Sequence, residues 1–314
     1  MNYLEAIVMG AIQGITELFP VSSLGHAVLI PALLGGQWSR DLSVSTPESP
    51  YLAFIVGLHV ATALALLVFF RRDWARIIRG FFTSVRYRRI RTAPERLAWL
   101  LILATIPVGV TGLLLEHTFR TVLGKPVPAA IFLMVNGVIL GGGELLRRRR
   151  EPAVNRAAAL HGPGLGAAVL RTPAVPDANA LGDDTALADV PRWRAVAIGA
   201  VQTLALLPGI SRSGVSMVAG MAVGLSHREA ARFSFLLATP VILAAGLLKL
   251  PDLFGPLGAS IHGQVLAGSA TAFVAALLAV AFLDRYFRTR TLIPFAVYSL
   301  VAGAASLGWL LLHP

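Results

Sequence analysis

The fold of this chain is decided at residues 13–26, which read QGITELFPVSSLGH, and again at residues 207–214, which read LPGISRSG. Both stretches are polar and lie between long apolar runs. A charged side chain at bilayer depth costs about 2.5–3.5 kcal/mol on insertion scales, so Glu17, His26 and Arg212 are rare there without a function. Proline and glycine in both stretches break helices, and broken backbone at membrane depth survives only where it lines a protein cavity. The two stretches therefore predict a site inside a membrane protein.

The composition supports a membrane protein. The chain is 56% hydrophobic and only 14% charged, with a mean hydropathy of +0.72, whereas soluble domains carry about 25% charged residues. A helix needs about 20 apolar residues to cross the hydrocarbon core. That length predicts six spans, at residues 51–70, 97–115, 127–146, 233–248, 265–283 and 292–312. The N-terminus carries Glu5 and no basic region, so it is not expected to be a cleavable signal.

The net charge of +11 does not indicate a nucleic-acid partner. The arginines lie in the segments between the spans, where the positive-inside rule puts them. Nine arginines lie in residues 71–96, seven in 147–192 and three in 284–291, whereas residues 37–50, 116–126 and 249–263 hold at most two basic residues each. The first three segments are therefore predicted to be cytoplasmic and the other three external. The absence of cysteine excludes disulfides, thiol catalysis and cysteine metal sites.

This topology leaves two apolar regions, residues 1–36 and 193–225. In each of them the chain must enter the membrane and come back to the same side. Each is predicted to be a re-entrant hairpin with its polar stretch at the tip. The chain is then a first repeat (1–150), a flexible cytoplasmic loop rich in Ala, Pro and Gly (151–191), and a second repeat (192–314).

Each repeat is a hairpin followed by three spans, and because three is odd the second copy is upside down. An ungapped offset of 189 supports the repeat by pairing Gly10 with Gly199, Gln13 with Gln202 and Ser22 with Ser211. Inverted repeats place their site near the membrane midplane at the repeat interface. The two tips are therefore expected to meet in an all-α, polytopic membrane fold.

The first tip combines a hydroxyl, an imidazole and a carboxylate. Pro20 suits the opening turn of a helix, which would put Ser22 and Ser23 near free N–H groups that bind anions. His26 is three residues after Ser23, so the two are expected on one helix face. An imidazole transfers protons near neutral pH. Glu17 supplies the carboxylate.

The second tip supplies a phosphate clamp. The guanidinium of Arg212 can bind phosphate with two parallel hydrogen bonds, and the hydroxyls of Ser211 and Ser213 add donors. Together the two tips predict phosphoryl chemistry. Glu17 alone is a poor metal cage, but Mg²⁺ is usually held by one or two carboxylates plus substrate phosphates, and a diphosphate would supply the missing oxygens.

Simpler readings exist for the same residues. The serines could be helix caps, the prolines could be kinks, and Glu17 could form a structural ion pair with Arg212. His59, with Thr62 in the span 51–70, is a weaker site candidate whose alternative is a hydrogen bond between helices. Glu144, directly before Arg147, is read as an interfacial acid that reaches toward water.

At these residues the chain resembles the undecaprenyl pyrophosphate phosphatase family, the bacitracin-resistance phosphatases. Four stretches carry the resemblance, which extends over nearly the whole chain: Gln13-x-x-x-Glu17-x-x-Pro20-Val21-Ser22-Ser23-x-Gly25-His26, Pro208-Gly209-Ile210-Ser211-Arg212-Ser213-Gly214, Leu58-His59-x-x-Thr62 and residues 233–240. It implies dephosphorylation of undecaprenyl diphosphate to the monophosphate carrier of cell-wall synthesis. It also implies a bacterial inner membrane, a site open to the external face, competition by bacitracin through binding of the substrate, and a divalent cation (Mg²⁺ or Ca²⁺). A homodimer is compatible with it.

Carried onto this chain, the resemblance makes Ser23 and His26 the leading reactive pair. Either Ser23 attacks phosphorus with His26 as base, or His26 activates water. Arg212 and Glu17 complete the catalytic set. The expected phosphate contacts are Ser22, Ser211, Ser213, Gly214, Ser216 and His59, and the expected metal ligands are Glu17 and Gln13. The family has Glu or Gln at the position of Gln13, and Gln leaves Glu17 as the main charged ligand.

Two other classes of protein share parts of this pattern. Inverted repeats with broken helices are common in transporters, so an anion or lipid-phosphate transporter is the main alternative. Another class of integral lipid phosphatase combines a Pro-Ser-Gly-His element with a Ser-Arg element and a downstream catalytic His. Here the nearest His after Arg212 is His227, beyond the second hairpin, which argues against that class.

Overall fold

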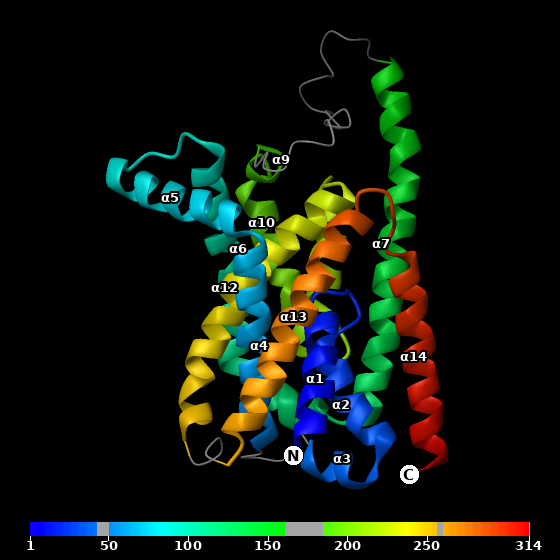
Figure 1. The fold of residues 1–314 in the computed structure, drawn as a ribbon. Helices are drawn as coiled ribbons and strands as arrows, with labels where there is room; N and C mark the ends of the chain where they lie inside the picture. Colours follow the sequence, from blue (N-terminus) through cyan, green and yellow to red (C-terminus); the bar gives the residue numbers. More distant parts are fainter. Residues whose placement is uncertain (43–49, 161–184, 256–259, 314) are drawn as a thin grey trace.

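The computed structural model describes residues 1–42, 50–160, 185–255 and 260–313, and every regular element in these ranges is a helix (Figure 1). In chain order the helices are α1 (Tyr3–Thr16), α2 (Ser23–Leu34), α3 (Gly36–Asp41), α4 (Pro50–Phe69), α5 (Arg71–Tyr87), α6 (Ala93–Leu123), α7 (Pro126–Leu160), α9 (Thr185–Ala188), α10 (Arg192–Val201), the 3₁₀ helix η1 (Gln202–Leu206), α11 (Arg212–Ala222), α12 (His227–Phe254), α13 (His262–Tyr286) and α14 (Ile293–Leu312).

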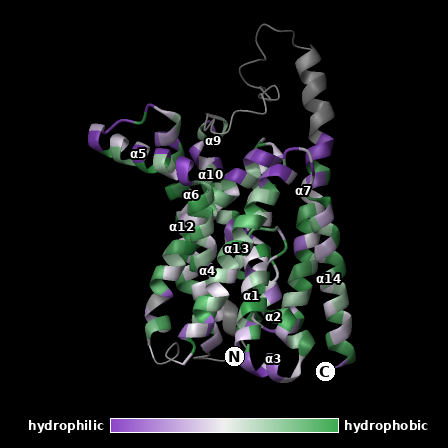
Figure 2. Ribbon diagram, in the orientation of Figure 1, coloured by the Kyte–Doolittle hydropathy of each residue, from purple (hydrophilic) through white to green (hydrophobic). Residues whose placement is uncertain are grey.

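Six of the described helices are long and apolar enough to cross a membrane. The spanning segments are Pro50–Phe69, Ala93–Leu115, Pro126–Arg149, His227–Lys249, His262–Tyr286 and Ile293–Leu312. Each overlaps one predicted span, so the all-α, multi-pass fold is confirmed. Figure 2 shows that these helices are mainly hydrophobic along their length, while hydrophilic residues gather at the end where α5 and α10 lie.

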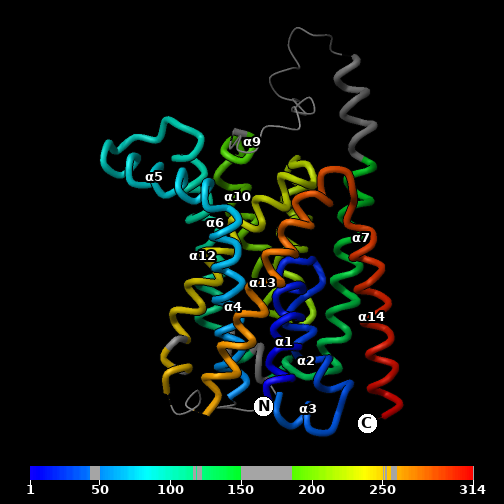
Figure 3. The backbone as a smooth tube through the Cα atoms, viewed as in Figure 1, coloured from blue at the N-terminus to red at the C-terminus, as the bar shows by residue number. Residues whose placement is uncertain are grey.

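Helices α1 and α2 form the first hairpin. They have 14 and 12 residues, or about 21 and 18 Å, and are too short to cross a core of about 30 Å. The amino group of Met1 lies 3.3 Å from the Asp41 carboxylate, so the chain returns to the end at which it began. Helices α1 and α2 thus form a hairpin, and α1 lies along α13 (Figure 3). That this hairpin is re-entrant in a membrane stays a prediction.

Helices α10, η1 and α11 form the second hairpin, and it comes from the opposite end of the molecule (Figure 1). The Arg194 side chain donates to the Val223 carbonyl at 3.2 Å, which joins the start of this hairpin to its end. The opposite directions of the two hairpins agree with the predicted topology. The symmetry relation between residues 1–150 and 192–314 stays a prediction.

Close helix contacts hold both hairpins in place. A Cβ atom on Gly10 would collide with the Gly268 carbonyl of α13, and one on Gly199 would collide with the Ala104 carbonyl of α6. Small residues let backbones approach in membrane proteins, where packing replaces the hydrophobic driving force. The offset of 189 thus pairs two glycines that each dock a hairpin against a spanning helix.

Two predicted segments differ from the structure. The arginine-rich stretch after α4 was expected to be a loop, yet residues 71–87 form α5, which lies across the ends of the spanning helices (Figure 1). Its buried Ile77, Gly80 and Ser84 recur at helical spacing, a periodicity that the arginine count does not reveal. The predicted loop 151–191 is shortened, because α7 continues to Leu160 and α9 occupies Thr185–Ala188. Residues 161–184 of that loop lie outside the described ranges.

Gly199→Ala is expected to destabilise the protein by about 1–3 kcal/mol, because the added methyl group meets a backbone carbonyl that cannot rotate away. Gly109→Ala on α6 is the matched control, since a Cβ atom there meets nothing within 4 Å. The midpoint of unfolding in detergent checks both variants. Equal midpoints for the two would contradict the close contact between α10 and α6.

Candidate active site

The first tip is a six-residue turn between α1 and α2. Helix α1 ends at Thr16, and α2 begins at Ser23 with Ser22 as its N-cap. The Ser22 hydroxyl accepts from the Gly25 N–H at 3.2 Å. Pro20 lies in the turn, so the expectation that it opens α2 is wrong: the helix starts three residues later. Ser22 has a φ of +70°, a strained conformation for a residue other than glycine, and such strain clusters at functional sites.

The second tip is built in the same way. Ser211 is the N-cap of α11, and its hydroxyl accepts from the Gly214 N–H at 3.1 Å. The backbone before it is opened by Gly209, which has a φ of +112° and packs against the Ala129 carbonyl of α7. Each tip is therefore followed by a helix whose N-terminus is capped by a serine and lies inside the protein.

The two tips are in contact, as predicted. The Gly209 N–H donates to the Ser22 hydroxyl at 3.2 Å, and the Ser213 hydroxyl donates to the Phe19 carbonyl at 3.2 Å. These bonds satisfy backbone groups that the broken helices leave open, which lipid could not do. The contact brings residues about 190 positions apart into one site.

Asn136 of α7 joins the tips from the side and was not predicted as a site residue. It is fully buried. Its amide donates to the Pro20 carbonyl at 2.9 Å and the Ser299 hydroxyl at 3.2 Å, and its carbonyl accepts from the Ser211 N–H at 2.9 Å. A lone amide in the middle of an apolar span was the signal that could have identified it, since buried polar groups need partners.

Glu17 is the centre of the site. Its Oε2 accepts from Gln13 Nε2 at 2.9 Å and from the Ser23 hydroxyl at 2.5 Å, and its Oε1 is paired with Arg212 of the second tip. The Arg212 guanidinium also donates to the Ala238 carbonyl of α12 at 3.2 Å. The side chains of Glu17 and Arg212 are only 5% and 15% exposed. Removing one partner of such a pair leaves a buried charge, which costs about 3–5 kcal/mol.

His59 approaches the same carboxylate from α4. Its Nε2 lies 3.4 Å from Glu17 Oε2, and its Nδ1 lies 2.9 Å from the Ile55 carbonyl of its own helix. Both ring nitrogens thus face acceptor oxygens, and a protonated His59 would add a second positive charge beside Glu17. Its side chain is 30% exposed. The structure therefore places His59, the weaker candidate from the sequence analysis, beside the Glu17 carboxylate.

Among the described residues, His26 makes its hydrogen bonds to groups other than the Ser23 hydroxyl. Its Nδ1 lies 2.7 Å from the Ser22 carbonyl, and its Nε2 lies 2.7 Å from the Tyr298 hydroxyl of α14. A carbonyl only accepts, so Nδ1 carries the proton, and in the neutral ring Nε2 accepts from Tyr298. The expected reactive pair is thus divided: Ser23 donates to Glu17, and His26 bonds to Tyr298.

The remaining serines mainly hold the second tip together. The Ser213 hydroxyl lies 3.0 Å from that of Ser211, and the Ser216 hydroxyl donates to the Arg212 carbonyl at 2.7 Å. These bonds fit the cap and helix-backbone readings. A direct phosphate contact from Ser211, Ser213, Gly214 or Ser216 stays a prediction.

The reading of Glu144 as an interfacial acid is wrong. Its side chain is fully buried and lies 2.7 Å from His227 Nε2 at the start of α12. Arg147 and Arg148 also lie within 3.4 Å of the carboxylate. Glu144 therefore links α7 to α12, with no hydrogen bond to the tips among the described residues.

The possible metal ligands around Glu17 fit a hard cation such as Mg²⁺ only in part. Gln13, Glu17 and Ser23 offer oxygen atoms, which Mg²⁺ and Ca²⁺ prefer. Within the described ranges, however, no group of three or more His, Cys, Asp or Glu side chains could hold a metal. The Glu17 carboxylate also already accepts from three side chains. A cation fits this set if a ligand supplies most of its coordination.

Comparison with known proteins gives one consistent result. Residues 6–305 match the family described as bacitracin resistance protein BacA. A protein named undecaprenyl-diphosphatase from Mycolicibacterium paratuberculosis is 64% identical over 317 residues, covering 100% of this chain and 99% of the relative. Proteins named undecaprenyl-diphosphatase 1 from Frankia casuarinae and undecaprenyl-diphosphatase 2 from Burkholderia lata are 54% and 40% identical, each over at least 96% of both chains.

Tyr298→Phe is expected to lower kcat about 3–10-fold, because it keeps the ring stacked on His26 but removes one hydrogen bond of about 0.5–1.5 kcal/mol. The measurement is steady-state phosphate release from a polyprenyl diphosphate in detergent. Tyr286→Phe is the control, since its hydroxyl bonds the Thr291 carbonyl away from both tips. A kcat equal to that of the unaltered protein would show that Tyr298 does not position His26.

Proposed function

The chain belongs to the bacitracin resistance protein BacA family, and we infer that it hydrolyses undecaprenyl diphosphate to undecaprenyl phosphate and inorganic phosphate. This reaction regenerates the lipid carrier of cell-wall synthesis. The structural observation that carries the inference is the shared carboxylate: Glu17 holds the Ser23 hydroxyl of one tip and the Arg212 guanidinium of the other. These three groups would serve as nucleophile, base and phosphate clamp inside an apolar bundle.

Ser23 is the nucleophile in this proposal, and Glu17 is its base. The Ser23 hydroxyl already donates to Glu17 at 2.5 Å, so the proton has an acceptor as the oxygen attacks the terminal phosphorus. The new bond joins Ser23 Oγ to phosphorus, and the bond from phosphorus to the bridging oxygen breaks. Undecaprenyl phosphate leaves with that oxygen. Water then hydrolyses the phosphoserine, releasing inorganic phosphate and restoring Ser23.

Arg212 changes partner during this reaction. With no substrate, its guanidinium rests on Glu17. A diphosphate between the tips would compete for that guanidinium, because phosphate accepts two parallel hydrogen bonds from it. Transfer of Arg212 to the phosphate leaves Glu17 with less positive charge beside it and makes it a better base. Arg212 then stabilises the charge that develops on the transferring group.

The histidines have different roles in this proposal. His59 faces the acidic centre and contributes positive charge when protonated. His26 holds the strained start of α2 through the Ser22 carbonyl, and thereby positions Ser23. The alternative in which His26 activates water requires its Nε2 to leave the Tyr298 hydroxyl.

A divalent cation is proposed to arrive with the substrate. Glu17 and the Gln13 carbonyl would hold it beside the diphosphate, whose oxygens complete its coordination. When bound, it neutralises charge on the diphosphate.

Phosphate release is expected to stop when EDTA is added and to return with excess Mg²⁺ or Ca²⁺. Activity that is unchanged by EDTA would remove the cation from the proposal.

The arginine-rich ends of the spans support an orientation of the protein in which the α1–α2 hairpin faces the outside of the cell. If α5 and α10 lie on the cytoplasmic side, the α1–α2 hairpin opens to the external face of a bacterial inner membrane. The substrate diphosphate would be reached from that face. Bacitracin would then compete by binding the substrate there, and a homodimer would leave the inward-facing tips unchanged.

Arg212→Ala is expected to lower kcat by about 10²–10³, the scale for loss of one preorganised donor at a developing charge. Phosphate release from undecaprenyl diphosphate in detergent measures it without any membrane gradient, so a transporter would give no signal. Arg290→Ala, an exposed arginine on the turn before α14, is the control and should retain activity. Near-normal release by Arg212→Ala would contradict the proposal.

Ser23 is expected to carry the phosphoryl group for part of the cycle. Rapid acid quench of enzyme mixed with substrate labelled in the terminal phosphate should leave label on the peptide that contains Ser23. Ser23→Ala should give neither label nor turnover, whereas Ser22→Ala should still become labelled at Ser23. Turnover by Ser23→Ala at the unaltered rate would instead favour direct attack by water.

A further inference from the structure

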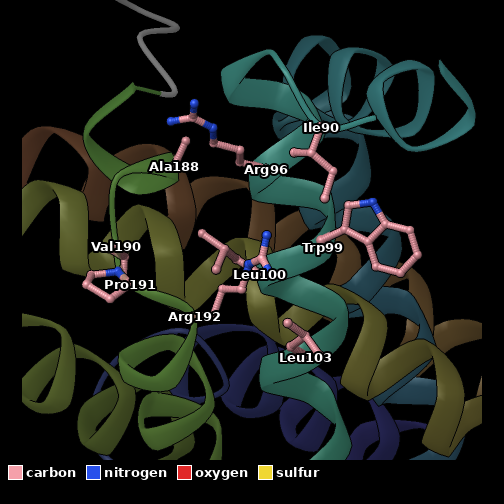
Figure 4. Close-up of a pocket in the computed structure, with 9 residues that line it drawn as sticks. All are labelled: Ile90, Arg96, Trp99, Leu100, Leu103, Ala188, Val190, Pro191 and Arg192. Atoms are coloured by element: carbon pink, nitrogen blue, oxygen red, sulfur yellow. The ribbon is translucent and has the colours of Figure 1, made fainter. Parts of the chain in front are cut away.

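A cavity lies at the arginine-rich end of the molecule, away from the hairpin tips. Its volume is about 370 Å³. Its walls come from the segment after α5, the first turns of α6, and the residues that lead into α10 (Figure 4). Nothing in the proposed hydrolysis uses it.

The cavity is lined by both charged and apolar side chains. Arg96 and Leu103 are both on α6, and their separation of seven residues corresponds to about 10 Å along the helix. Figure 4 shows Arg96 at the upper rim and Leu103 at the lower end, with Trp99 and Leu100 between them. A molecule that fills this space must combine an anionic group with an apolar part.

Two arginines from opposite walls give the cavity its charge, with Arg96 at the upper rim and Arg192 lower down, between the levels of Leu100 and Leu103 (Figure 4). Arg96 belongs to α6, and Arg192 is the first residue of α10. Asp189, which is 73% exposed, lies 3.7 Å from Arg96. Among the described residues, no carboxylate lies within ion-pair range of Arg192. The first turn of α10 also has no side-chain cap, because its N-cap is Pro191, so its N–H groups add to the positive potential.

The position of the cavity matches the membrane surface. Arg96 lies one turn inside the spanning segment Ala93–Leu115. Trp99 is a residue type enriched at the membrane–water interface, and its indole N–H donates to Ser84 of α5 at 2.9 Å. Helix α5 lies across the span ends at the same level and exposes Ile78, Phe82 and Val85. Their spacing puts these three apolar side chains on one helix face.

We propose that this cavity binds the phosphate headgroup of an anionic phospholipid from the leaflet on the arginine-rich side. Arg96 and Arg192 bind the phosphate, and the first acyl carbons lie against Trp99 and Leu103. Basic pockets beside spanning helices on the cytoplasmic side bind anionic headgroups in this way. The occupant is a lipid because a free phosphate would leave the apolar side chains of Trp99, Leu100 and Leu103 uncovered.

Native mass spectrometry of the delipidated full chain in detergent tests the site. The probes are phosphatidylglycerol and phosphatidylcholine with the same acyl chains. Phosphatidylglycerol is expected to bind more tightly. The double variant Arg96→Gln/Arg192→Gln is expected to weaken its binding by about tenfold and to leave phosphatidylcholine unchanged. Arg285→Gln/Arg290→Gln, two exposed arginines at the same end, is the matched control and should bind like the unaltered protein.

Leu103→Trp separates the cavity from a diffuse basic surface, because it fills the lower end without changing charge. It is also expected to weaken phosphatidylglycerol binding, and retained phosphate release shows that each variant has folded. An equal loss in the control pair, or unaltered binding by Leu103→Trp, would overturn the proposal in favour of a general surface charge. Displacement of the lipid by inorganic phosphate at equal concentration would overturn it in favour of a simple anion site.

Discussion

The ion pair between Glu17 and Arg212 joins two hairpins that otherwise end in the middle of a membrane protein. Each charge alone would be strongly unfavourable in this apolar bundle, and each is acceptable because the other lies beside it. The pair therefore requires both hairpins to reach the same depth. Ser23, Gln13 and His59 then surround the Glu17 carboxylate. The ion pair thus holds the two hairpins together and also gathers polar groups that can take part in a reaction.

Backbone N–H and C=O groups at the tips that have no helical partner must find hydrogen bonds elsewhere in the protein. The turn of residues 17–22 and the segment 207–211 lie between helices, where some backbone groups have no helical partner and lipid offers no replacement. Ser22 and Ser211 cap the outgoing helices, and Asn136 bonds to both tips at once. The same bonds that satisfy the backbone also fix Ser23 and Arg212 at the starts of their helices. Stability and positioning of the site thus rest on one hydrogen-bond network.

The fold and the site could be predicted to different extents. The six spans and the meeting of the tips followed from hydropathy, arginine placement and the polar stretches, because these patterns reflect the local requirements of a bilayer. Helix α5 was missed because its many arginines outweighed its apolar periodicity. The partners within the site were predicted less well. Ser23 and His26 share a helix, but their hydrogen bonds go to Glu17 and Tyr298, on different elements.

By itself, the sequence determined that this is a multi-pass membrane protein with two broken-helix tips that hold charged side chains. It could do so because charge, proline and glycine at membrane depth are rare and local signals. Only the tertiary structure decided which groups face each other: Ser23 with Glu17, His26 with Tyr298, and Asn136 with both tips. Those pairings depend on how α2, α7 and α14 pack. Packing of α7 against α14 is set by small residues such as Gly137 and Gly303, whose backbone contacts lie on a helix far along the chain.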